Sequence, residues 1–155
     1  MSHAGRDQEH HYEIHEVDGG DAAVALDLET LHALTFWKDA PPIDPENGHW
    51  WIARLGKKPV GFAGMSESRQ YPHAGYFSRV GVLPAHRGHG LQLRFLRAAE
   101  ARARRNGWSS IVADTRDARS ANNFAKAGYQ IFDPERRWAY PDSIYWRKDL
   151  RNRPG

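Results

Sequence analysis

A run of ten residues, Val82 to Leu91, constrains the fold of this chain more than any other part of the sequence. It joins a segment rich in strand-forming residues to a segment with helical periodicity, and it contains Gly88 and Gly90. Glycine lets the backbone approach an anion without a Cβ in the way. The amides of the loop and of the first helical turn have no partners within the helix and can bind negative charge. The run therefore predicts a strand, a phosphate-binding loop and a helix in succession, with a loop that suits a pyrophosphate.

The spacing of apolar residues predicts the remaining elements. The helix after the loop has Leu91, Phe95, Ala99 and Ala103 at four-residue intervals, and Asn106-Gly107 is typical of a left-handed cap. We expect strands at 12–17, 50–55, 60–66, 75–82, 109–113, 129–132 and 144–150, and helices at 21–37, 91–105 and 120–127. This order predicts an α/β (α+β) fold in which helices pack on the faces of a mixed sheet.

The length of 155 residues suits one domain with an ordinary hydrophobic core. We expect that domain to cover residues 12–150, between a polar, disordered N-terminal tail (1–11) and a short C-terminal tail (151–155). No segment approaches the roughly 20 apolar residues that cross a bilayer, and the start of the chain lacks a secretory signal pattern. We therefore expect a cytoplasmic protein without a membrane partner.

The sequence contains no cysteine. Disulfides, thiolate metal sites and cysteine nucleophiles are therefore excluded. A serine nucleophile elbow is missing too, because the segment Gly64–Ser68 lacks its second glycine. His11 and His15 are four residues apart, but no HExxH pattern completes them, and we expect no metal. Any acyl transfer by this chain must proceed by direct attack of the acceptor.

Charge is distributed unevenly along the chain. Residues 1–75 hold 6 Lys and Arg against 12 Asp and Glu, and residues 76–155 hold 16 against 7. The half that carries the glycine loop is therefore basic, which suits an anionic cofactor, and the acidic half suits a cationic substrate. The arginine-rich helix 91–105 leaves a second interpretation open, a basic nucleic-acid-binding module. Its arginines surround the helix instead of forming one stripe, and the acidic half would repel a phosphate backbone, so nucleic acid is the less favoured partner.

Two segments resemble signatures of the GNAT superfamily of acetyl-CoA-dependent N-acetyltransferases. The family's pyrophosphate loop has the pattern Q/R-x-x-G-x-G/A, and residues 85–90 read Ala-His-Arg-Gly-His-Gly. A later family pattern, N-x-x-S/A-x-x-F-Y-x-K-x-G-F, is similar to residues 117–129. The resemblance covers Tyr12 to about Leu150. It implies the GNAT fold, a central, mixed but mostly antiparallel sheet of six to seven strands flanked by helices.

Three positions depart from the family patterns. Ala85 stands where the family has Gln or Arg, which removes one side-chain contact to the pyrophosphate. Asp117 stands where an Asn often contacts the cofactor, although Asn122 and Asn123 are near enough to substitute. Phe124 stands where many members have the tyrosine that protonates the leaving thiolate. The resemblance therefore leaves the general acid unassigned.

The resemblance implies acetyl-CoA as the co-substrate. The loop amides from Arg87 to Leu91 would hold the pyrophosphate, and Arg87, Arg119 and Lys126 are candidates for the 3′-phosphate. In the family the fourth strand splays from the fifth, which would place the backbone of Val80 to Val82 along the pantetheine arm. The expected cofactor-binding residues are Val80, Gly81, Val82, Arg87, Gly88, His89, Gly90, Leu91, Asn122, Asn123, Phe124 and Lys126.

Transfer to an amine requires a base. A lysine-like amine has a pKa of about 10.4, so only about 1 molecule in 1000 is neutral near pH 7, which corresponds to roughly 4 kcal/mol. Asp114, at the end of the fifth strand, and Glu67, after the third, are the candidate bases, each directly or through water. For the acid, Tyr140 and Tyr145 lie in the late loop and strand, and a water would also serve.

The sequence thus predicts a GNAT-type N-acetyltransferase that transfers an acetyl group directly to a primary amine in a ternary complex. The acceptor is a small cationic amine or a protein amine, and the tryptophans Trp37, Trp51 and Trp138 flank loops that shape the acceptor pocket in this family. A CoA-binding protein of the same fold without transferase activity stays open because of Phe124. A homodimer stays open as well.

Overall fold

The computed structural model describes residues 11–151. Its helices are α2 (Ala22–Thr35), α3 (Leu91–Arg105) and α4 (Ala118–Lys126), with a short 3₁₀ helix η1 (Pro84–His86) before α3. Its strands are β1 (Tyr12–Val17), β2 (His49–Leu55), β3 (Lys58–Glu67), β4 (Ala74–Val82), β5 (Ser110–Thr115), β6 (Gln130–Phe132) and β7 (Ile144–Asp149). Most of the predicted N-terminal tail, residues 1–10, and residues 152–155 of the C-terminal tail lie outside the described residues.

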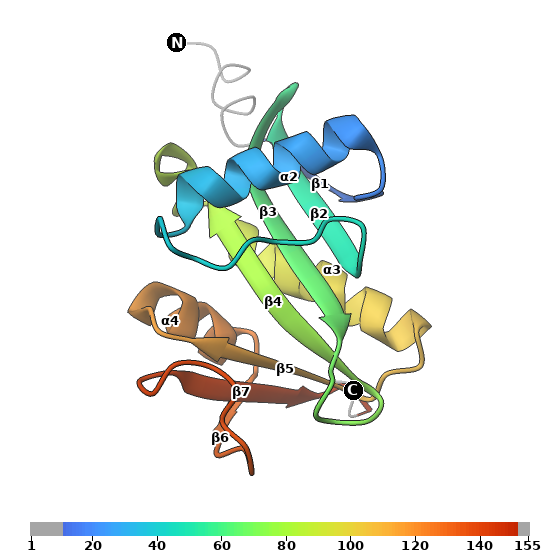
Figure 1. The fold of residues 1–155 in the computed structure, drawn as a ribbon, viewed down its shortest axis with the longest axis vertical. Helices are drawn as coiled ribbons and strands as arrows, with labels where there is room; N and C mark the ends of the chain where they lie inside the picture. Colours follow the sequence, from blue (N-terminus) through green and yellow to red (C-terminus); the bar gives the residue numbers. More distant parts are fainter. Residues whose placement is uncertain (1–10, 152–155) are drawn as a thin grey trace. The chain divides into compact units, whose positions relative to one another are not determined.

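The strands form one seven-stranded sheet in the order β1-β2-β3-β4-β5-β7-β6 (Figure 1). Strand β1 pairs antiparallel with β2, and β7 pairs antiparallel with both β5 and β6. Strand β4 pairs parallel with β5. The predicted fold class, a mixed but mostly antiparallel sheet flanked by helices, is confirmed.

Internal contacts divide the chain into two compact units. Unit 1 contains residues up to Gly64 together with Arg79–Leu91, and unit 2 contains Met65–Ser78 together with the chain from Gln92 onward. Strands β3 and β4 contribute residues to both units. The single domain expected over residues 12–150 stays a prediction.

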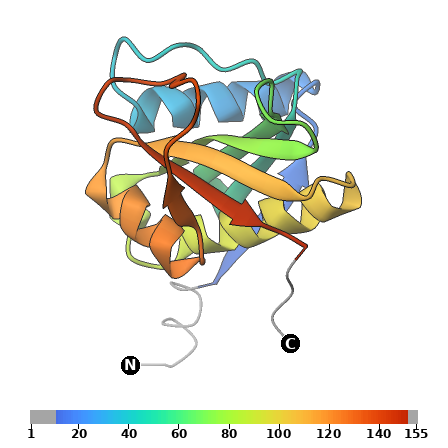
Figure 2. The same cartoon turned by 90° about the horizontal axis from the view of Figure 1, so that it is seen from below.

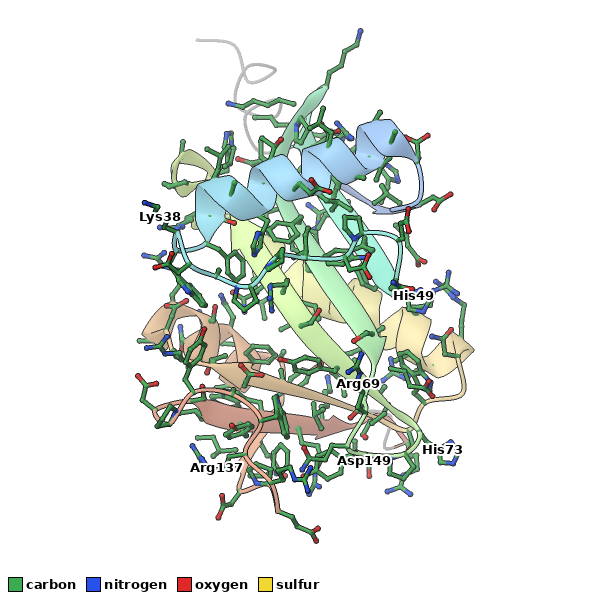
Figure 3. The ribbon with its side chains drawn as sticks, in the orientation of Figure 1. Lys38, His49, Arg69, His73, Arg137 and Asp149 are labelled. Carbon is green, nitrogen blue, oxygen red and sulfur yellow. The ribbon has the colours of Figure 1, made fainter. Side chains whose placement is uncertain are left out.

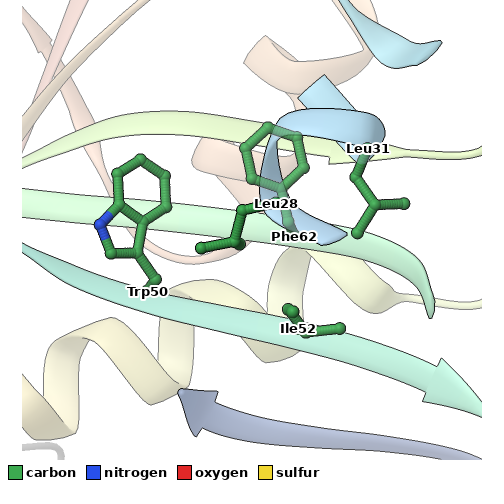
Figure 4. Packing of buried hydrophobic residues seen from close by; sticks show 5 residues of the cluster. All are labelled: Leu28, Leu31, Trp50, Ile52 and Phe62. Atoms are coloured by element: carbon green, nitrogen blue, oxygen red, sulfur yellow. The ribbon is translucent and has the colours of Figure 1, made fainter. Parts of the chain in front are cut away.

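The core of unit 1 forms between α2 and strands β2 and β3. Leu28 and Leu31 on α2 are buried against Trp50, Ile52 and Phe62 (Figure 4). Full burial of one such side chain contributes roughly 1.5–3 kcal/mol. The helix begins where predicted, because the Asp21 carboxylate accepts hydrogen bonds from the first free amides of the helix at 3.0 and 3.1 Å.

In unit 2, α3 and α4 lie on the same face of β5 and β7 (Figure 2). The apolar stripe predicted for α3 is buried, since Phe95, Ala99 and Ala103 are all fully inaccessible to solvent. A buried polar network ties this helix to β7. Glu100 accepts a hydrogen bond from Tyr129 at 3.0 Å and pairs with Lys148 at 2.9 Å.

Capping and turn chemistry explain where the elements differ from the sequence expectation. Helix α4 begins at Ala118, two residues before the predicted start, because the Asp117 carboxylate accepts from the amide of Arg119 at 2.9 Å. Strand β5 continues to Thr115, which places Asp114 inside the strand. Helix η1 was not predicted, and Pro84 occupies its first position.

Neither a membrane helix nor a metal cluster is found within residues 11–151. The longest helices there are too short and too polar to cross a bilayer. No three potential metal ligands among His, Asp and Glu gather at one place in this part of the chain.

Candidate active site

The loop between η1 and α3 contains two residues in the left-handed backbone region. Gly88 has a φ of 84° and Gly90 a φ of 73°, a conformation that costs a residue with a Cβ about 1–2 kcal/mol. An added Cβ at either glycine would have no heavy atom within 4 Å. Both positions therefore face open space, and it is the backbone conformation that requires glycine. The loop leads directly into α3, whose first amides have no partners within the helix.

The side chain of Tyr12, on β1, supports this glycine loop from within unit 1. Tyr12 Oη and His86 Nδ1 lie 3.0 Å apart, and the Tyr12 ring lies 5.3 Å from the ring of His89. Burial lowers the pKa of His86, and the positive charge of Lys58 and the neighbouring His89 lower it further. His86 is therefore neutral near pH 7, and the positive potential of the loop comes from its amides and from the exposed Arg87. The sequence carried no signal for the role of Tyr12.

Residues 80–82 of β4, whose backbone is expected to lie along the pantetheine arm, are closely packed in unit 1. A Cβ added to Gly81 would lie 2.2 Å from Thr35 Oγ1, so glycine is required there by the approach of α2. Val80 and Val82 are half-buried, and Leu91 at the end of the glycine loop is 3% exposed. These residues can offer backbone groups to a ligand more readily than side chains.

Pairing of β4 with β5 is limited to one end of β4. The pairs are Ala74 with Ser110, Gly75 with Ile111 and Tyr76 with Val112, although β4 continues to Val82. Among the residues that the structure describes, the parallel ladder therefore ends at Tyr76. The expected divergence of the fourth strand from the fifth stays a prediction.

Among the predicted cofactor residues on helix α4, one lies in the core of unit 2 and others lie at its surface. Phe124 is 2% exposed and packs against Phe77, Tyr129 and Trp146 with ring centroids 5.1–6.0 Å apart. The exposed members are Asn122 and Lys126, and Arg119 is exposed on the same helix. Phe124 is therefore a core residue, and the surface of α4 is formed by other side chains.

Asn123 has a polar partner that the sequence did not reveal. Its amide donates to Gln92 Oε1 at 3.1 Å, and Ser120 Oγ lies 3.4 Å from the same oxygen. Gln92 is the second residue of α3 and is 8% exposed. Its Nε2 is buried and has no hydrogen-bond partner among the described residues. Asn123 thus positions a glutamine at the start of α3.

The carboxylate of Asp114 is the polar centre of unit 2. Its Oδ2 accepts a hydrogen bond of 2.6 Å from the hydroxyl of Tyr76 and one of 2.9 Å from the indole Nε1 of Trp138. Tyr76 lies on β4, Asp114 on β5, and Trp138 on the loop before β7. All three side chains are half-buried. This arrangement can hold a carboxylate in a fixed orientation while leaving it accessible to solvent.

Aromatic rings enclose Trp138 on several sides. Tyr71 and Tyr76 meet it edge-on at 6.3 and 6.0 Å, and Tyr145 does so at 4.5 Å. The guanidinium of Arg137, labelled in Figure 3 on the loop before β7, lies 4.8 Å from the ring centroid of Tyr145. Trp138 thus places a packed aromatic ring beside the Asp114 carboxylate.

Three other catalytic candidates belong to unit 2. Tyr145 on β7 is 1% exposed, whereas Glu67 and Tyr140 lie at the surface of the unit. Glu67 is the last residue of β3 and is exposed. Tyr140 is 39% exposed, and the guanidinium of Arg116 lies 4.3 Å from its ring centroid. No hydrogen bond joins either side chain to Asp114 in the described part of the chain, since the bonds of Asp114 are those to Tyr76 and Trp138.

The three tryptophans that were expected to flank the acceptor pocket, Trp37, Trp51 and Trp138, differ in their burial. Trp51 is 2% exposed, so it is a core residue and the expectation that it flanks a pocket is wrong. Strand β2 shows no alternation of buried and exposed residues at its centre, because Trp50, Trp51, Ile52 and Ala53 are all buried. Trp37 is 50% exposed in unit 1. Trp138 donates a hydrogen bond to Asp114, one of the candidate catalytic groups.

Comparisons with known proteins agree with this architecture. The model of the acetyltransferase (GNAT) family matches residues 8–129. The Salmonella typhimurium protein yncA, solved with its cofactor acetyl-CoA, is 20% identical with a TM-score of 0.69, over 94% of this chain and 97% of that one. A comparison with curated proteins found no matching sequence.

Two further solved structures have the same fold. The ribosomal-protein-S18-alanine N-acetyltransferase of Escherichia coli is 12% identical, with a TM-score of 0.68 over 90% of this chain and 94% of that one. A Bacillus subtilis acetyltransferase in complex with CoA is 15% identical, with a TM-score of 0.67 over 90% and 99%. At such identities the likeness establishes the fold, and the family model covers most of the chain. The chain therefore belongs to the GNAT family of acetyltransferases.

Proposed function

We propose that this chain is an N-acetyltransferase that moves an acetyl group from acetyl-CoA directly to a primary amine within a ternary complex. The observation that carries the proposal is the open loop of Gly88 and Gly90, two left-handed glycines at the start of α3. The relatives that hold acetyl-CoA or CoA support the same co-substrate.

The loop has the chemistry that a pyrophosphate needs. It combines backbone amides at a helix start with open space at both glycines, and residues 83–90 include no acidic side chain. In this proposal the amides from Arg87 to Leu91 hold the pyrophosphate, and Arg87, Arg119 and Lys126 supply positive charge for the 3′-phosphate. The backbone of Val80 to Val82 lies along the pantetheine arm.

Bound acetyl-CoA supplies the acetyl group as a thioester, which an amine can attack directly. The chain has no cysteine that could carry the acetyl group in between. The amine must lose a proton before it attacks, and a carboxylate at the site accepts that proton. We assign this role to Asp114, because its side chain is oriented by two hydrogen bonds and is half-buried.

Glu67 and Tyr140 complete the set of proposed catalytic residues. Glu67 is the second candidate for the base, and its exposure favours action through water. Tyr140 is a candidate for the acid that protonates the leaving thiolate, since its hydroxyl belongs to a partly exposed side chain in the loop before β7. Phe124 cannot supply that proton, because it has no hydroxyl.

The acceptor is a primary amine, and a cationic one fits a site built on a carboxylate and aromatic rings. A protein amine, such as the alanine named for the Escherichia coli relative, and a small cationic amine are the two classes to be separated. The cytoplasmic location and the homodimer expected from the sequence stay predictions within this proposal.

The test is an amine-panel assay that detects the free thiol of released CoA. The absence of cysteine means that the protein itself gives no background with a thiol reagent. The panel should include polyamines, aminoglycosides, amino acids and peptides with free N-termini or lysines. We expect thiol release with at least one amine, and loss of that release in Asp114→Asn but a smaller effect in Glu67→Gln.

The opposite outcomes identify the alternatives. Binding of acetyl-CoA without thiol release from any amine would favour a CoA-binding protein that has lost transfer, in line with Phe124. Salt-sensitive binding to random DNA together with no binding of acetyl-CoA would favour the nucleic-acid module and refute the proposal.

A further inference from the structure

Asp114 uses only one of its two carboxylate oxygens within unit 2. The hydroxyl of Tyr76 and the indole of Trp138 both donate to Oδ2. Oδ1 has no hydrogen-bond partner among residues 11–151. A half-buried carboxylate with one occupied and one available oxygen is oriented for a further donor.

The two donors hold Oδ2 from rigid surroundings. Tyr76 belongs to the last pair of the parallel ladder, opposite Val112, which precedes Asp114 by two residues on the same face of β5. Trp138 is contacted edge-on by three tyrosine rings, and its indole nitrogen can only donate. Neither donor can be turned away from Oδ2 without moving packed rings.

Other aspartates of this chain show what a purely local role looks like. Asp21 and Asp117 accept hydrogen bonds from backbone amides and cap α2 and α4. Asp114 lies within a strand, and both of its hydrogen bonds come from side chains far away in the sequence. Its environment is therefore built by tertiary structure and serves no cap or turn.

We propose that Tyr76 and Trp138 are positioning residues that fix Asp114 so that Oδ1 faces the acceptor amine and takes its proton. This inference rests on the proposed function and deepens it. An N–H bond of the ammonium breaks as the O–H bond to Oδ1 forms. The nitrogen lone pair then bonds to the acetyl carbon, and the carbon–sulfur bond breaks with its electron pair on sulfur. Sulfur takes a proton from the acid, Tyr140 or a water molecule, and solvent then replaces that proton. The new amide nitrogen and Asp114 each release one proton to solvent.

This arrangement also defines the acceptor as one that arrives as a cation. An ammonium can donate to Oδ1 in the ground state, whereas a neutral amide or hydroxyl acceptor would leave the negative charge of Asp114 without a counter-charge. The acceptor class is therefore an amine that is protonated at neutral pH.

The experiment compares Tyr76→Phe and Trp138→Phe with the matched control Tyr71→Phe. The control removes a hydroxyl from the same group of rings, but that hydroxyl does not bond to Asp114. Hydrogen bonds to a charged group favour that charge. We expect the acidic limb of the kcat/KM profile to move to higher pH by about one unit in Tyr76→Phe, with kcat lowered roughly tenfold.

A second readout needs no substrate or acetyl-CoA. In ¹⁵N-labelled protein, the indole N–H signal of Trp138 is identified by its loss in Trp138→Phe. We expect this signal to titrate at acidic pH in the wild type, not to titrate in Asp114→Asn, and to titrate at a higher pH in Tyr76→Phe. Tyr71→Phe should follow the wild type.

The outcomes separate this inference from the proposed function. An unchanged indole titration and an unchanged acidic limb in Tyr76→Phe would overturn the inference, even if the wild type acetylates amines. If Trp138→Phe does not fold, the inference is still tested by two other variants. These are Tyr76→Phe and Asp114→Asn, in which the pH dependence of the Trp138 indole signal is compared with that of the wild type. Failure of the wild type to acetylate any amine would overturn the proposed function, whatever the indole signal shows.

Discussion

Phe124→Tyr restores the tyrosine that many GNAT members have at this position, and the structure predicts that it destabilises this protein. The side chain is 2% exposed and lies between the rings of Phe77, Tyr129 and Trp146. The polar atoms of Tyr129 and Trp146 already have hydrogen-bond partners elsewhere. A new hydroxyl would therefore be buried without a ready partner, which costs about 1–3 kcal/mol.

A loss of that size lowers Tm by roughly 2–4 °C for each kcal/mol in a protein of this length, or by about 4–8 °C for a loss near 2 kcal/mol. Calorimetry and urea unfolding measure the change. Phe132→Tyr is the matched control, because Phe132 is half-buried and a hydroxyl there can reach water. We expect the control to stay within about 0.5 kcal/mol of the wild type. A Phe124→Tyr protein that is as stable as the wild type, and that gains kcat, would refute the assignment of this ring to the core.

Three further perturbations have expected outcomes. Glu100→Gln should lower the free energy of unfolding, measured by urea titration, by about 2 kcal/mol, because Lys148 loses its buried counter-charge. An unchanged free energy of unfolding would show that the ion pair is dispensable. Since the folded-state pKa of His86 lies below its usual value, the unfolded chain binds a proton more readily, and stability should fall as the pH drops below about 6.5. His86→Gln should weaken this dependence when unfolding is compared at pH 7.5 and 5.0, and an identical dependence would contradict the shift. Gly81→Ala should cost about 1–3 kcal/mol by thermal unfolding, since its Cβ would meet Thr35 at 2.2 Å, and a neutral effect would show that α2 can move aside.

The glycine loop and its helix could be predicted from the sequence because their chemistry is local. Helix α3 spans Leu91–Arg105 as expected, and Gly107 after it has a φ of 78°, as a left-handed cap requires. Gly88 and Gly90 likewise have the positive φ for which glycine is suited. Each of these features depends on residues within one turn or one helix.

The surroundings of Asp114 could not be predicted in the same way. Tyr76 and Trp138 are 38 and 24 residues away in the sequence, and only the packing of unit 2 brings them to one oxygen. The burial of Trp51 was missed for a related reason. Its strand is buried on both faces, so no alternation of polar and apolar residues marked the side that faces solvent.

In the proposed function, the loop of Gly88 and Gly90 binds the pyrophosphate of acetyl-CoA. Calorimetric titration of acetyl-CoA into the double variant Gly88→Ala/Gly90→Ala tests it most directly. The matched control is Gly56→Ala/Gly107→Ala, because these glycines also have positive φ and open space at the Cβ position, and they lie in other turns.

Both double variants introduce the same kind of backbone strain, so a general loss of stability affects them alike. We predict that acetyl-CoA binding weakens at least about tenfold in the Gly88/Gly90 variant, a change of about 1.4 kcal/mol, and stays near the wild-type value in the control. Equal affinity in the wild type and the Gly88/Gly90 variant, with both folded, would contradict the claim.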